Sequence, residues 1–239
     1  SVISQRVGRV RSGRAARATG WRPRIPLPIA PRMTADDQLA AIRDRIARAA
    51  RLARRAPEDV TLIAVSKTHP IDAIRPFLLA GHRDFGENRV QEAEQKWRPL
   101  QEEFGGTRLH VIGQLQSNKA AEAVAIADAI HSVDRSSLIS AIARAIDATG
   151  RRPACFIQVN IGAEPQKGGC AIDHLPRLLA EARAAGLPIA GLMCIPPAGV
   201  DAAPYFALLA KIAREEGVAG LSMGMSDDVD TAVTLGATH

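Results

Sequence analysis

A lysine at the end of an apolar segment is the first residue of this sequence that could do covalent chemistry. Leu62 to Val65 are four apolar residues in a row, typical of a buried strand, and Ser66 and Lys67 follow directly. A lysine there would lie at the carboxyl end of the strand, partly desolvated. Burial lowers the pKa of a lysine, and the neutral amine attacks carbonyl carbons. Lys67 is therefore predicted to form a Schiff base with an aldehyde. A lysine that only reaches solvent at the rim is the other interpretation.

Polar residues also follow the other apolar segments. They are amides, hydroxyls, acids and further lysines, within 86–89, 113–119, 131–134, 160–167 and 222–226. In a parallel barrel the chemistry lies at the carboxyl ends of the strands, and this mixture suits an anionic ligand with several hydrogen-bonding atoms. Each residue alone has a simpler explanation. Asn118, Asp134 and Ser226 could only cap helices, and His110 and His131 are interpreted as ordinary strand residues.

The cysteines do not indicate a metal site. Cys155, Cys170 and Cys194 lack the CxxC spacing of metal ligands, and two of them lie in apolar segments. The pattern predicts reduced, buried thiols in a cytoplasmic protein that binds no metal.

The segments between the polar groups alternate between strand and helix patterns. Predicted strands are 60–66, 82–86, 108–113, 129–133, 154–161, 189–195 and 220–223; predicted helices are 71–80, 88–98, 117–127, 136–148, 173–185, 202–216 and 227–235. An amphipathic helix precedes them, from a capping box at Thr34 to about Arg55. Left-handed caps are predicted where glycines end the helices, at Gly81, Gly150, Gly186, Gly217 and Gly236.

Apolar strands that are each followed by a helix imply a parallel sheet covered by helices. The predicted fold is α/β, a single (β/α)8 TIM-type barrel with an extra N-terminal helix. A doubly wound open sheet is the alternative, but it usually has a glycine-rich loop after its first strand. Here no glycine occurs between Lys67 and Gly81.

The basic residues are unevenly distributed. Eight of the 31 basic residues lie in residues 1–32, which contain no acid, so the rest has 23 basic and 25 acidic side chains. We predict a disordered Arg-rich extension at 1–33, a barrel domain at 34–239, and no nucleic-acid or membrane partner for the folded part. An organellar transit peptide is the alternative for the extension, but its closely spaced prolines break amphipathic helices.

Seven motifs in order resemble the YggS/PROSC family of pyridoxal phosphate homeostasis proteins. They are AVSKTHP, FGENRVQEAEQKW, HVIGQLQSNK, SVDR, QVNIGAEPQKGG, GLMCIPP and LSMGMSDDVDTAVTLGATH. The resemblance extends from about residue 36 to 239. It implies a barrel like the N-terminal domain of alanine racemase.

The resemblance also implies a cofactor. Pyridoxal 5′-phosphate (PLP) would be bound as a covalent aldimine on Lys67 of the VSK motif, with Asn88 beside it. Ser226 of MGMS would bind the phosphate, and Asn160, Met193 and Ser222 would line the site.

The end of the sequence departs from the family pattern. An eighth strand should begin at Ala237, and the family continues there with an arginine and a Gly-Thr pair that help to hold the cofactor. Either the barrel lacks its closing strand or the sequence is cut short. In the first case the first and seventh strands have unpaired edges, and weakened PLP binding or poor folding is expected.

The family resemblance implies a non-catalytic protein that carries or buffers PLP and maintains vitamin B6 and amino-acid/keto-acid homeostasis. The expected partners are PLP and PLP-dependent apo-enzymes, and the expected state is a monomer. Racemases of this barrel type use a catalytic tyrosine from a second domain, whereas the only tyrosine here, Tyr205, lies in a helix pattern. The alternatives are an amino-acid racemase with Lys67 as its lone base, and nucleic-acid binding by the arginine-rich extension.

Overall fold

The computed structural model describes residues 33–239, which form parallel strands alternating with helices. The strands are β1 (Ala64–Val65), β2 (Asp84–Glu87), β3 (Arg108–Val111), β4 (Ala129–Val133), β5 (Ala154–Gln158), β6 (Ile189–Met193) and β7 (Gly220–Ser222). The predicted disordered extension lies outside the described residues apart from Met33, so that prediction and the domain boundary at 33/34 stay predictions.

The helices follow the strands as predicted. They are α1 (Ala35–Leu52), α2 (Ile71–Leu79), α3 (Val90–Glu103), α4 (Ala120–Ile126), α5 (Ser136–Thr149), α6 (Leu175–Ala184), α7 (Ala203–Glu215) and α8 (Val229–Thr234), with 3-10 turns η1 (Pro57–Asp59), η2 (Ser117–Lys119) and η3 (Ile172–His174). Within residues 33–239, none of these helices is long and apolar enough to cross a membrane.

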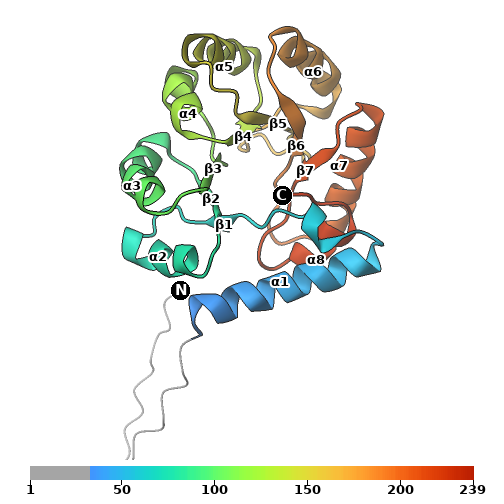
Figure 1. The fold of residues 1–239 in the computed structure, drawn as a ribbon. Helices are drawn as coiled ribbons and strands as arrows, with labels where there is room; N and C mark the ends of the chain where they lie inside the picture. The colour runs from blue at the N-terminus through green and yellow to red at the C-terminus, as the bar shows by residue number, and fades with distance from the viewer. Residues whose placement is uncertain (1–32) are drawn as a thin grey trace, which may run out of the picture. The chain divides into compact units, whose positions relative to one another are not determined.

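All seven strands pair in sequence order, from β1 to β7, and every pair is parallel. Figure 1 shows the strands curling around a common centre with the helices outside them. A doubly wound sheet changes direction after a central strand, and this order does not. The barrel prediction is therefore confirmed, with seven strands among the described residues.

Local signals in the sequence set the ends of several helices. The predicted capping box begins α1, where the Thr34 side chain accepts the Asp37 N–H and the Asp37 carboxylate accepts the Thr34 N–H. The five glycines predicted to end helices all have left-handed φ values, at Gly81, Gly150, Gly186, Gly217 and Gly236. Helix α3 extends past the predicted end at 98, because Pro99 is accommodated inside it.

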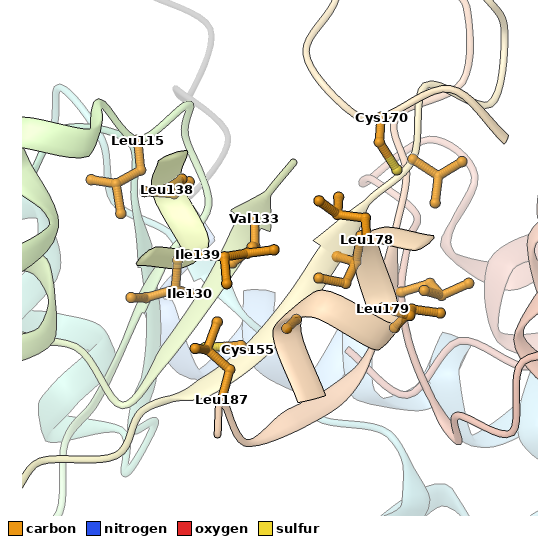
Figure 2. Packing of buried hydrophobic residues seen from close by; sticks show 14 of the residues in the cluster. Leu115, Ile130, Val133, Leu138, Ile139, Cys155, Cys170, Leu178, Leu179 and Leu187 are labelled. Atoms are coloured by element: carbon orange, nitrogen blue, oxygen red, sulfur yellow. The ribbon is translucent and has the colours of Figure 1, made fainter. Parts of the chain in front are cut away.

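The main hydrophobic core lies between the helices and the outer face of the sheet. Figure 2 shows part of it, where leucines and isoleucines of α5 and α6 meet strand residues such as Ile130 and Cys155. A second cluster joins α2 and α3 to β2 around Phe85 and Trp97. Burying such side chains contributes about 1.5–3 kcal/mol each.

The inner face of the sheet is packed differently. Because side chains alternate along a strand, the neighbours of Phe85 and Ile130 point to the other face, where Asp84 and His131 lie buried. The His131 ring stacks on Phe156 with centroids 4.4 Å apart. The barrel interior therefore contains polar and aromatic groups, whereas the main aliphatic core is outside it.

The last three residues lie between the first and seventh strands. The Thr61 N–H donates to Thr238 O (2.8 Å), the Thr238 N–H donates to Leu221 O (2.8 Å), and the Met223 N–H donates to His239 O (3.1 Å). The expectation that both strand edges are unpaired is thus wrong for β7 and for the segment just before β1. Further along β1, Val65 remains 47% exposed.

Gly191 on β6 is required by close packing. A Cβ there would lie 1.9 Å from the backbone oxygen of Gly220, which cannot move without disturbing β7. We expect Gly191→Ala to lower the free energy of unfolding by about 3 kcal/mol or to prevent folding. Gly105→Ala is the matched control, because its Cβ would meet nothing within 4 Å. Urea unfolding of both variants measures this, and equal stabilities would contradict the packing account.

Candidate functional site

Lys67 lies at the carboxyl end of β1 and is exposed. Its predicted partial desolvation is wrong, because no described strand covers the second edge of β1 beside it. The residues on either side of it are anchored. Ser66 is buried and its Oγ donates to Glu87 Oε1 (2.7 Å), while the Thr68 N–H donates to Glu92 Oε1 (2.9 Å).

Asn88 lies on the neighbouring strand end. Val65 pairs with Gly86 in the sheet, so Lys67 and Asn88, each two residues further on, follow the ends of adjacent strands. Gly113 lets this segment approach the end of β3, since a Cβ on residue 113 would lie 2.4 Å from the backbone oxygen of Asn88.

The loop after β7 contains Ser226, which is exposed. The Arg45 side chain on α1 donates to the Ser226 carbonyl oxygen (2.8 Å) and to Asp230 Oδ2 (2.9 Å). Within the loop, the Met225 N–H donates to the Asp228 carboxylate (2.6 Å). The Ser226 side chain does not cap α8, whose N-cap is Asp228. Its hydroxyl is therefore available to a ligand.

Lys67 follows β1 and Ser226 follows β7. The segment 237–239 lies between these two strands, hydrogen-bonded to Thr61 before β1 and to Leu221 in β7. Two interstrand spacings amount to about 10 Å, so β1 and β7 are about that far apart. Because all strands are parallel, the amine and the hydroxyl both belong to the carboxyl end of the barrel.

The other predicted site residues differ in accessibility. Met193 and Ser222 are neighbours in the β6–β7 register and both are buried. The Asn160 amide binds within its own loop, donating to Glu164 O (2.8 Å) and accepting from the Glu164 N–H (3.1 Å). Asp134 does not cap α5 with its side chain; it accepts the Gly169 N–H (3.2 Å) instead.

A chain of buried side chains crosses the barrel interior, and the sequence did not predict it. Asp84 Oδ1 lies 3.0 Å from His110 Nε2, His110 Nδ1 lies 3.0 Å from His131 Nε2, and His131 Nδ1 lies 2.8 Å from Ser222 Oγ. These residues come from β2, β3, β4 and β7. His110 and His131 are strand residues, as predicted, but their pairing follows only from the closed order of the strands.

The charges of this chain are set by burial. Burial lowers the pKa of His131 well below its ordinary value, and His110 and His239 add to this effect. Burial likewise lowers the pKa of His239 to about 4. Burial alone would raise the pKa of Asp84, but hydrogen bonds from His110 and Arg108 lower it to about 2. The interior thus holds one carboxylate, whereas His131 and His239 are neutral.

The cysteines, possible metal ligands and surface hollows give weaker indications of a functional site. The three cysteines are buried as predicted, and burial raises the pKa of each thiol to about 12. Among residues 33–239, no group of three or more His, Cys, Asp or Glu could hold a metal ion. Two surface hollows, of about 390 and 480 Å³, lie beside Trp97 and beside Arg135, and neither is lined by Lys67 or Ser226.

Known proteins resemble this chain over most of its length. Residues 38–222 match the family model described as alanine racemase, N-terminal domain. The pyridoxal phosphate homeostasis protein of Escherichia coli is 38% identical over 217 residues, covering 84% of this chain and 90% of that protein. That of Deinococcus radiodurans is 41% identical over 204 residues, covering 84% and 92%. PipY of Synechococcus elongatus with PLP bound superposes with a TM-score of 0.75 at 37% identity, covering 85% and 94%.

The buried histidines predict a pH-dependent stability. A histidine whose pKa is lowered in the folded state binds its proton only on unfolding, so stability is lost as pH falls below about 6.5. One histidine held neutral accounts for about 2 kcal/mol between pH 8 and pH 5. We expect this loss for the wild type in urea unfolding and a smaller one for His131→Asn. His174→Ala, which removes an exposed histidine, should keep the wild-type slope. Parallel pH profiles for wild type and His131→Asn would contradict this account.

Proposed function

The chain belongs to the family described as alanine racemase, N-terminal domain, together with the pyridoxal phosphate homeostasis proteins, and we propose that it binds PLP through Lys67. Its role would be to carry or buffer PLP and so to maintain vitamin B6 and amino-acid/keto-acid homeostasis. One observation supports this most directly: an exposed lysine follows β1 and an exposed serine follows β7, so both lie at the carboxyl end of the parallel barrel.

The donor groups at these strand ends fit PLP. PLP brings an aldehyde, which reacts with primary amines, and an anionic phosphate. The Lys67 Nζ would bond to the aldehyde carbon with loss of one water, which needs no oxidant or reductant. Ser226 and the N–H groups of its loop would hold the phosphate, and Asn88 would contact the cofactor from the end of β2.

The remaining predicted residues would act less directly. Ser222 is occupied by His131, so we assign it, with Met193, to the floor of the site. Asn160 would shape the loop after β5, because both ends of its amide are bound there. The proposed site thus has a reactive side after β1, with Lys67, and a phosphate side after β7, with Ser226. Met193, Ser222 and Asn160 would support the residues that contact the cofactor.

The position of the single tyrosine favours a holding function over catalysis. Tyr205 lies in the first turn of α7 and packs against the hydrophobic core. A racemase would then have Lys67 as its lone base, which is the alternative. We further propose that the protein acts as a monomer and passes PLP to apo-enzymes.

A spectroscopic titration tests the proposal. Adding PLP to the wild type should produce a visible absorption band, and Lys67→Ala should lack it. Lys211→Ala is the control, since it removes an exposed lysine of α7 paired only with Glu215. Ser226→Ala should weaken PLP binding about tenfold, because a hydrogen bond to a charged group contributes about 1.5 kcal/mol.

Two results would overturn the proposal. A band of equal intensity in Lys67→Ala would exclude Lys67 as the point of attachment. Exchange of the α-deuteron of alanine with inversion, lost in Lys67→Ala, would instead support the racemase.

A further inference from the structure

We infer that Glu87, Glu92 and Lys96 form a positioning cluster that fixes the backbone on both sides of Lys67 and thereby sets how fast the Lys67 amine captures PLP. The inference rests on the proposed function and extends it to residues behind the site. None of the three side chains needs to touch the cofactor.

The centre of the cluster is the Lys96 ammonium. It has three donors, and all three are used: on Ser66 O (2.9 Å), Glu87 Oε1 (2.9 Å) and Glu92 Oε1 (3.1 Å). The Lys96 side chain is only 9% exposed and that of Glu87 is fully buried. A charge taken out of water in this way is tolerated only when it is paired and hydrogen-bonded.

The cluster lies in β2 and α3, but its contacts outside them all reach the Lys67 loop. The Ser66 Oγ donates to Glu87, the Ser66 carbonyl accepts from Lys96, and the Thr68 N–H donates to Glu92. The residues before and after Lys67 are therefore both held. Among the described residues, the Lys67 amine itself makes no hydrogen bond or ion pair and stays available for reaction.

The held backbone is strained. Thr68 has φ of +62°, a left-handed conformation that β-branched residues rarely adopt. Such strain costs about 1–3 kcal/mol and persists only where the surroundings impose it. The bond from the Thr68 N–H to Glu92 imposes it here. The strained turn directs the chain away immediately after Lys67.

The cluster is not optimised for stability. Within residues 33–239, Glu87 Oε2 is buried and has no hydrogen-bond partner. Replacing a buried ion pair by apolar residues is often neutral or stabilising, so a buried carboxylate with one unpaired oxygen contributes little to stability. The hydrogen bonds of Glu87 are better explained by positioning: they fix Ser66 and, through Ser66, Lys67.

Glu92 is the best residue for a test, because its side chain is 33% exposed and its variants should fold. Glu92→Ala removes the acceptor for the Thr68 N–H, whereas Glu92→Gln retains a carbonyl oxygen that can accept it. Glu94→Ala is the matched control, since Glu94 lies on the same helix and pairs only with the exposed Arg98.

Two readouts separate positioning from general destabilisation. In the protein without PLP, hydrogen exchange at the Thr68 amide should be at least tenfold faster in Glu92→Ala than in Glu94→Ala. On mixing with PLP in a stopped-flow instrument, the visible band should appear about tenfold more slowly in Glu92→Ala. Glu92→Gln should restore most of both rates, and the thermal midpoints of the variants should differ by only a few degrees.

The inference is overturned if Thr68 exchange is unchanged in Glu92→Ala, or if exchange rises while the PLP rate equals that of Glu94→Ala. A wild type without a Lys67-dependent band contradicts the proposed function as well. In that case the hydrogen-exchange result alone decides whether the cluster fixes this backbone.

Discussion

The buried Glu87 carboxylate is the constraint on which the reactive side of the site depends. One of its oxygens accepts from Ser66, Lys96 and Trp97 at 2.7–3.0 Å, so it joins β1 to the helix behind β2. Strand β1 has only two residues in the ladder and one paired edge at its carboxyl end. These side-chain bonds add to the backbone bond from the Ser66 N–H to Gly86 O (2.9 Å) in fixing the segment that contains Lys67. The buried Glu87 carboxylate thus helps to hold the end of β1 in place, as pairing with a neighbouring strand holds the other strands of the barrel.

The loop that is proposed to bind the phosphate is fixed by contacts from α1. Helix α1 packs along α8 through Ile46, Ala50 and Val233. From this helix Arg45 binds the Ser226 loop, and just after the helix Arg55 donates to the carbonyls of Val233 and Ala237 (both 2.8 Å). The first helix therefore supports the last loop of the described chain. Both sides of the proposed site are loops fixed by groups that lie behind them, as is usual where precise geometry is needed on a rigid scaffold.

The sequence predicted the elements well, because apolar strands and amphipathic helices leave periodic signals in the chain itself. It also located Lys67, Asn88 and Ser226 at strand ends. It could not predict the chain from Asp84 to Ser222, because those contacts join residues up to 91 positions apart and depend on strand order. For the same reason it could not predict the bond from Arg45 to Ser226, which lies 181 residues further along the chain. Asn160 was predicted to line the site, but its amide is bound within its own loop, which residue type alone does not reveal.

The central claim is that PLP attaches to Lys67, and reductive labelling tests it most directly. The protein would be mixed with PLP, reduced with borohydride, digested and analysed by mass spectrometry. The account predicts one label per chain, on the peptide that contains Lys67. A folded protein labelled on other lysines, such as Lys119 or Lys211, with Lys67 unmodified, would contradict it.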